Sequence, residues 1–171
     1  MAGTLQSGFK WQSNYNRQYL RLDDGKDKTP DGILEFSGKD SSRIFKTKAS
    51  SKGPDYVNIM HSNTKLYLAK LPGKTGTPLL IGATAENPNE NLIDENCTLF
   101  ELFKAEEDGP TNATHGDFRI RHAQSNLYLT PQKVYFNTDT CTAAVTSEAV
   151  LCAVSSNQNR GDVDLFTLTW G

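Results

Sequence analysis

Apolar and polar residues alternate along short stretches of this 171-residue chain. In one such stretch, Phe118, Ile120 and His122 fall on one face of an extended segment, and the residues between them fall on the other. A period of two is typical of a half-buried β-strand. No segment carries a sustained helical period, and the nearest candidate, residues 141–154, is rich in Ala, Val and Thr, which suits a strand about as well. The pattern predicts an all-β fold.

Three stretches repeat the same order of residues. In each, an apolar residue stands eight positions before a tyrosine, and a leucine follows the tyrosine. The three stretches contain Trp11, Tyr19 and Leu20, then Ile59, Tyr67 and Leu68, then Ile120, Tyr128 and Leu129. A second shared element closes each repeat around Phe45, Phe100 and Phe166. Such repetition indicates three copies of one unit that cannot bury its apolar face alone.

Turn-forming residues interrupt each repeated stretch, at positions 13–16, 62–65 and 124–126. Asn and Ser close tight turns by bonding their own backbone, so each stretch is predicted to be a hairpin. Three units of four short strands predict a β-trefoil, a closed fold with few exposed edges. A β-sandwich is the alternative. The predicted units are residues 1–52, 53–107 and 108–171 of a single domain, which is long enough to bury a core.

The three cysteines, Cys97, Cys141 and Cys152, are an odd number and fit no disulfide framework. Cys97 is predicted to be a small core residue, and the other two are predicted to be free thiols rather than a bridge. The first residues form neither a basic nor an apolar run, and no stretch is apolar enough for a membrane span. We therefore expect a cytoplasmic or nucleocytoplasmic protein without a membrane span.

Charge is divided unevenly along the chain. Residues 1–52 hold ten Lys and Arg against six Asp and Glu, a net +4, whereas the other residues hold eight against fourteen, a net −6. One interpretation is solvated strand faces, and the other is a head-to-tail homodimer held by opposite charges. No dense basic run is interleaved with aromatic residues, so no nucleic-acid partner is expected.

The sequence offers no assembly of nucleophile, base and orienting acid. His61 and His122 hold equivalent places in two repeats, where the first repeat has Ser13, so both are predicted to be structural. Residues 86–91 lack the spacing of a calcium loop and are predicted to be an ordered loop capped by their own amides. We expect no enzymatic activity, no catalytic residues, no metal site and no cofactor, which leaves a binding protein.

A resemblance to a known family indicates which ligands such a binding protein would have. Residues 82–91, Gly-Ala-Thr-Ala-Glu-Asn-Pro-Asn-Glu-Asn, and residues 96–100, Asn-Cys-Thr-Leu-Phe, closely resemble the amaranthin (agglutinin-domain) lectins of plants. Residues 16–21 and 65–68 agree as well, and the likeness covers essentially the whole chain. It implies a non-enzymatic β-trefoil that binds galactose- and N-acetylgalactosamine-containing glycans in plant stress or defence. The type member pairs head to tail, with the sugar between domains of different subunits.

The chain departs from the type member after the middle Tyr-Leu strand. There the type member has a loop rich in Trp, Asn, His and Tyr, whereas residues 70–80 contain no aromatic side chain. Sugar sites usually need a flat ring beneath the apolar face of the pyranose and a few polar groups that fix its orientation. This loop therefore lacks the stacking surface of the family site.

Two positions remain as candidate glycan sites. The first keeps the family position and consists of Lys70, Lys74, Thr75 and Thr77, with Asn87, Asn89 and Asn91 nearby. The second is the equivalent position of the third repeat and consists of Gln132, Tyr135 and Asn137. In both cases the repeated tyrosines and leucines are expected to be structural, and the connecting turns are expected to carry recognition.

Two other functions fit the sequence. Fascin-like actin bundlers also repeat an Asn-x-x-Tyr-Leu line, and a basic set in the first repeat would then meet an acidic partner. That set is Lys39, Arg43, Lys46, Lys48 and Lys52. Members of the amaranthin family also occur fused to aerolysin-type pore-forming domains. The end of the chain, one residue after Thr169 and Trp170, would then mark a targeting domain cut from a longer protein.

Overall fold

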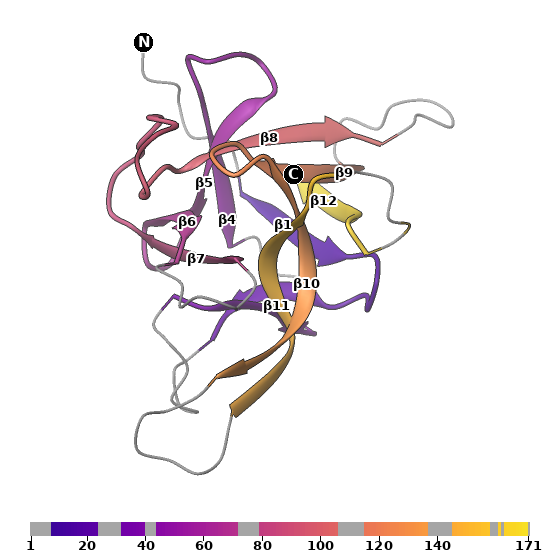
Figure 1. Ribbon diagram of the computed structural model, residues 1–171. Helices are drawn as coiled ribbons and strands as arrows, with labels where there is room; N and C mark the ends of the chain where they lie inside the picture. The colour runs from indigo at the N-terminus through magenta and orange to yellow at the C-terminus, as the bar shows by residue number, and fades with distance from the viewer. Residues whose placement is uncertain are drawn as a thin grey trace.

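A computed structural model describes residues 8–23, 32–39, 44–71, 79–105, 115–136, 145–157, 161 and 163–170. Every regular element in these ranges is a β-strand, which confirms the all-β prediction (Figure 1). The strands are β1 (Phe9–Ser13), β2 (Tyr19–Leu22), β3 (Leu34–Gly38), β4 (Phe45–Ala49), β5 (Tyr56–His61), β6 (Leu66–Lys70), β7 (Leu79–Ala85), β8 (Leu99–Lys104), β9 (His115–His122), β10 (Leu127–Phe136), β11 (Val145–Ser155) and β12 (Phe166–Trp170). The ambiguous segment before Val154 is thus a strand from Val145 onward.

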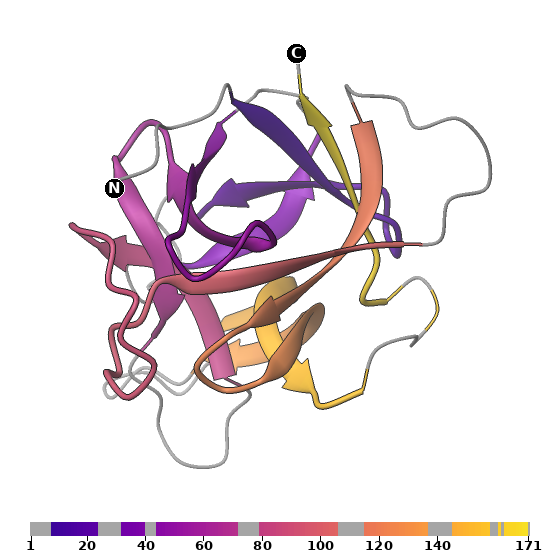
Figure 2. The same ribbon diagram turned by 90° about the horizontal axis from the view of Figure 1, so that it is seen from above.

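Six strands close into a ring through antiparallel pairs, in the order β1, β4, β5, β8, β9, β12 and back to β1. The other six form three hairpins, β2–β3, β6–β7 and β10–β11, each joined to the ring through its first strand. Strand β11 also pairs with β3 and β7. Viewed from above, segments from every part of the chain surround a common centre (Figure 2). The same pairing pattern thus occurs three times along a closed barrel.

All twelve strands contribute to one buried apolar cluster. The apolar residues that open the repeats, Trp11, Ile59 and Ile120, are each at most 1 % exposed. The repeated leucines and phenylalanines belong to the same cluster: Leu20, Leu68, Leu129, Phe45, Phe100 and Phe166. Each chain segment alone leaves one face apolar, and closure of the barrel removes these faces from water.

Each ring strand β1, β5 and β9 leads into its hairpin through the same turn. Arg17, Lys65 and Asn126 each adopt a φ of 59° there. Their N–H groups donate to the carbonyl oxygens of Ser13, His61 and His122. Asn adopts this left-handed conformation more readily than most residues, whereas Arg and Lys are held in it by the turn.

The two histidines of these turns are buried parts of the scaffold, as their equivalent places predict. His61 is 3 % exposed and His122 has no exposed surface. Each Nδ1 lies within hydrogen-bond distance of a hydroxyl three residues later, 2.9 Å from Thr64 and 2.8 Å from Ser125. Burial lowers the pKa of both rings, and the pKa of His122 falls to about 4.

Candidate functional site

The structure describes only part of the first predicted glycan site. Lys70 ends β6, and Lys74, Thr75 and Thr77 lie outside the described residues. Asn87, Asn89 and Asn91 lie in the connection between β7 and β8, where Asn87 and Asn91 are exposed. Of the second predicted site, Gln132 is partly exposed on β10, with Nε2 2.9 Å from the Thr130 hydroxyl. The Tyr135 side chain and Asn137 lie outside the described residues.

The asparagine side chains fold the β7–β8 connection. The Asn89 side chain accepts from the Asn91 N–H at 3.0 Å and donates to an Asp94 carboxylate oxygen at 3.0 Å. The Asn91 side chain accepts from the Ile93 N–H at 3.1 Å. The prediction of a loop capped by its own amides is confirmed. These groups already have partners within the loop, so a ligand would have to compete with them.

Glu90 fastens this connection to the barrel. Its carboxylate accepts from Asn58 Nδ2 at 2.7 Å and from the Ser50 and Ser51 hydroxyls at 2.8 and 3.3 Å. The Thr98 hydroxyl donates to Asn58 Oδ1 at 2.6 Å. Burial alone raises the pKa of Glu90, but the hydrogen bonds outweigh it and hold the pKa below the usual value. The connection is therefore a fixed part of the surface.

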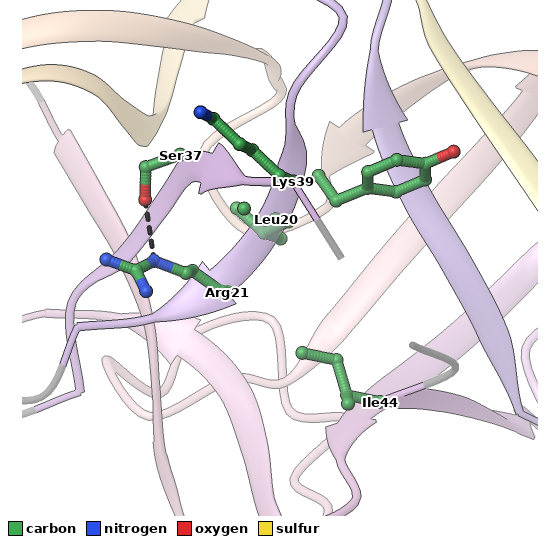
Figure 3. A pocket seen from close by; sticks show the side chains of 7 residues that line it. Leu20, Arg21, Ser37, Lys39 and Ile44 are labelled. Atoms are coloured by element: carbon green, nitrogen blue, oxygen red, sulfur yellow. Dashed lines mark hydrogen bonds between the residues drawn. The ribbon is translucent and has the colours of Figure 1, made fainter. Parts of the chain in front are cut away.

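An open pocket lies where β2, β3 and the start of β4 meet (Figure 3). Its volume is about 520 Å³, within the range of roughly 300–1,000 Å³ that is typical of small-molecule sites. The lining residues are Tyr19, Leu20, Arg21, Ser37, Gly38, Lys39 and Ile44. None of them is among the residues predicted to bind a glycan. Tyr19 also departs from the expectation that the repeated tyrosines are only structural.

The first repeat has a glycine opposite its tyrosine, where the other repeats have a residue with a side chain. The register pairs Tyr19 with Gly38, Tyr67 with Ala85, and Tyr128 with Ser155. Tyr67 and Tyr128 are 7 % and 6 % exposed, whereas Tyr19 is partly exposed. A Cβ at position 38 would lie 3.1 Å from the Tyr19 carbonyl oxygen, which is a tight contact, 3.6 Å from Arg21 Cδ and 3.7 Å from Tyr19 Cβ. Glycine thus keeps open a space that a side chain would enter.

A second difference concerns the ring of the repeated tyrosine. In the third repeat, Phe103 covers Tyr128, with 5.7 Å between the ring centroids. Phe103 of β8 pairs with Arg119, which lies three residues before the end of β9. Lys10 has the same place in β1 and pairs with Thr169 of β12, so Thr169 is the equivalent of Phe103 in the first repeat. Threonine offers no ring to pack on Tyr19. Tyr19 thus lacks the ring contact that Tyr128 has, although Tyr67 is buried without such a contact among the described residues.

On the polar side of the pocket, hydrogen bonds connect the lining residues Arg21 and Ser37 to Glu35 behind them. Arg21 Nε donates to the Ser37 hydroxyl at 2.7 Å, and this hydroxyl donates to Glu35 at 3.1 Å. Arg21 Nη2 lies 3.7 Å from the same Glu35 oxygen. The Arg21 side chain is 56 % exposed, so its contacts with Ser37 and Glu35 orient it and leave it accessible to a ligand. Leu20 and Ile44 supply apolar lining (Figure 3).

Two signals in the sequence point to this pocket. Arg21 follows the first Tyr-Leu pair, where the other repeats have Ala69 and Thr130. The connection from β3 to β4 is also shorter than the connections from β7 to β8 and from β11 to β12. A comparison of the repeats position by position, for differences rather than for likeness, would have found both signals.

The described ranges contain neither a metal-binding cluster nor a membrane-spanning helix. No three His, Cys, Asp or Glu side chains there are grouped so that they would hold a metal ion. In the same ranges, no helix has the length and apolar character needed to cross a bilayer.

No family model and no curated protein matches the chain. Solved structures do match. A designed 3-fold symmetric protein, ThreeFoil, aligns with a TM-score of 0.57 at 12 % identity over 94 % of this chain and 96 % of that one. The SDF2-like protein from Arabidopsis thaliana aligns with a TM-score of 0.62 at 12 % identity over 98 % and 94 %. The Saccharomyces cerevisiae protein O-mannosyltransferase Pmt1–Pmt2 complex, bound to the sugar donor, aligns with a TM-score of 0.62 at 14 % identity over 98 % of this chain and 26 % of that one. At these identities the likeness concerns the fold alone.

Proposed function

We propose that this chain is a β-trefoil domain of the amaranthin type, with units at residues 1–52, 53–107 and 108–171, that binds glycans and has no enzymatic activity. The threefold recurrence of the strand pairing supports the fold, as does the likeness to a designed 3-fold symmetric protein. A sugar donor in one of the structural neighbours is a property of that protein, and it agrees with a carbohydrate-binding role for the fold.

The observation that carries the proposal is the pocket between β2 and β3. A pyranose has an apolar face and a rim of hydroxyl groups, so its site needs apolar surface beside convergent hydrogen-bonding groups. The pocket combines the partly exposed Tyr19 and the apolar Leu20 and Ile44 with the polar groups of Arg21 and Ser37. A single open site of this kind would bind in the millimolar range, about −4 kcal/mol.

A glycan array followed by an NMR titration with the best glycan tests the proposal. We expect Tyr19→Ala and Gly38→Val to abolish binding, because the first removes the aromatic surface and the second fills the pocket. Ala85→Val is the matched control, since it adds the same branched side chain at the equivalent place of the second repeat. No binding by folded protein at high concentration would refute the proposal. Loss only with Tyr135→Ala, or only with changes in residues 70–80, would move the site to the hairpin tips.

We place this activity in the cytosol or nucleus, in plant stress or defence. Weak single sites gain on the order of 10²–10⁴ in avidity when they are paired. Head-to-tail association of the net-positive first repeat with the net-negative remainder would supply such pairing. Sizing the protein at low and high salt tests this, and a monomer at both salt concentrations contradicts it.

A protein-interaction role is the second candidate. Leu92 and Ile93 are 47 % and 89 % exposed in the β7–β8 connection that Glu90 fastens. Large exposed apolar side chains on a fixed loop are a common feature of protein interfaces. Co-sedimentation with actin, compared between the natural chain and Ile93→Asp, tests the fascin-like form of this function. Recovery of the natural chain in the supernatant would contradict this function, and equal pelleting of the two chains would contradict the role of Ile93.

A further inference from the structure

We propose that the pocket between β2 and β3 selects saccharides that carry a carboxylate or sulfate group over neutral ones. This inference depends on the glycan-binding function proposed above and narrows its ligand class. It is carried by the charge and orientation of the side chains that line the pocket.

The first observation is the charge of the lining. Of the seven described residues around the pocket, Arg21 and Lys39 are cationic and none is acidic. Lys39 is exposed and forms no ion pair within the described residues. Arg21 is paired with Glu35 on one side, whereas Lys39 has no such partner among the described residues, so an acidic group on the sugar would supply a counter-charge that a neutral sugar lacks. Figure 3 shows Arg21, Ser37 and Lys39 at the β2–β3 side of the pocket, with Ile44, the residue before β4, on another side.

The second observation is the fixed orientation of Arg21. Its Nε donates to Ser37, and its Nη2 lies 3.7 Å from Glu35. These contacts lie on the Nε side of the guanidinium, and no described residue forms a hydrogen bond or ion pair with Nη1 at its outer edge. That edge matches a carboxylate or sulfate in a two-point hydrogen bond. An arginine that is already oriented loses less side-chain freedom when it binds.

Glu35 does not cancel this preference. It is not among the residues that line the pocket, and its side chain is 17 % exposed. One of its carboxylate oxygens accepts the Ser37 hydroxyl. Its position beside the Nε side of Arg21 orients the guanidinium and offsets part of its charge, and the Lys39 charge adds to what remains.

The other two repeats lack this arrangement. The register pairs Arg21 with Glu35, whereas the equivalent pairs are Ala69 with Gly82 and Thr130 with Cys152. Ala69, Thr130 and Cys152 are each at most 1 % exposed. Any preference for acidic saccharides that comes from this register position therefore belongs to the first repeat.

The test compares three probes by NMR titration: galacturonic acid, its methyl ester and galactose. The ester has nearly the shape of the acid without its charge. We expect the acid to bind about tenfold more tightly than the ester, and we expect this advantage to shrink as salt rises from 50 to 300 mM. Arg21→Gln should remove most of the advantage of the acid over the ester, because it removes one of the two cations of the lining. Lys52→Gln is the matched control, because it removes an equal charge from an exposed turn outside the pocket.

The possible outcomes separate the two proposals. Equal binding of the acid and the ester, or equal losses with Arg21→Gln and Lys52→Gln, would overturn the preference and leave glycan binding intact. Inorganic sulfate that binds at the same residues as tightly as the acid would show a simple anion site and overturn the saccharide preference. Absence of binding by all three sugars, together with a negative glycan array, would overturn both proposals.

Discussion

Thr98→Val removes one hydroxyl from the network that fastens the β7–β8 connection to β5. The Thr98 hydroxyl donates to Asn58 Oδ1 at 2.6 Å and accepts from the Asn89 N–H at 2.8 Å. Thr98 has no exposed surface and Asn58 is 1 % exposed. Valine has nearly the same shape but offers neither interaction, so two polar groups lose a partner that water does not readily replace.

Each such group costs about 1–3 kcal/mol when its partner is removed. We therefore expect Thr98→Val to lower the free energy of unfolding by about 3 kcal/mol, which corresponds to roughly 6–12 °C in Tm for a chain of this size. Ser51→Ala is the control within the same network. Its hydroxyl is exposed and lies 3.3 Å from Glu90, so its loss should cost less than about 0.5 kcal/mol. Thr98→Ser should recover most of the loss.

Urea unfolding at pH 7, followed by tryptophan fluorescence and by circular dichroism, measures these differences. Coincident curves from the two probes would justify a two-state treatment. If Thr98→Val and Ser51→Ala have the same stability within error, the hydroxyl network does not hold the connection. The reasoning about Glu90 would then fail as well.

The ionisation of Glu90 gives the same network a pH dependence. Its pKa is lower in the folded protein than the ordinary value of 4.5, so folding favours the carboxylate. Its contribution to stability is therefore present above about pH 4.5 and is lost as the pH falls through the folded pKa. Glu90→Gln should destabilise the protein at pH 7, and the difference from the natural chain should shrink below pH 4. A difference that grows on acidification would contradict this sign.

Three further predictions follow from buried groups. Burial, with a smaller effect of the Lys70 charge, lowers the pKa of His122 from 6.5 to about 4. The free energy of unfolding should therefore fall by roughly 3 kcal/mol from pH 6.5 to below pH 4. An NMR titration of this ring with a midpoint near 6.5 would contradict this prediction. Burial raises the pKa of Cys152 to about 12, so mass spectrometry should find it unmodified by iodoacetamide at pH 8 unless the protein unfolds. Arg119→Met removes a cation that lies 3.0 Å from the fully buried Asp164 carboxylate, which should cost about 3 kcal/mol in urea unfolding; a change below 1 kcal/mol would contradict it.

The strands and the core were predictable because their signal is local. Alternation places Trp11, Ile59 and Ile120 on inward faces, and the equivalent phenylalanines meet them at the centre of the barrel. A one-residue slip in register would turn these side chains to the outside. The amide-capped loop was predictable for the same reason, since Asn89 and Asn91 bond to groups within five residues.

The pocket was not predicted because it depends on residues far apart in the sequence. Tyr19 and Tyr128 occupy equivalent places, so the repeat predicts the same structural role for both. They differ because Phe103 covers one ring and because Gly38, rather than a residue with a side chain, faces the other. Pairing across the sheet decides both differences, and a residue pattern along the chain does not show which strands pair.

Comparing equivalent positions of the three repeats separates residues that serve packing from residues that do not. At the position after the repeated leucine, Ala69 and Thr130 are buried, which is the solution that packing favours. Arg21 at the same position keeps most of its charged side chain in water and is oriented by Ser37 and Glu35. An exposed ion pair of this kind contributes little stability, so packing does not explain the arginine. A ligand that needs a fixed cation would explain it, which supports the proposal that recognition lies in the first repeat.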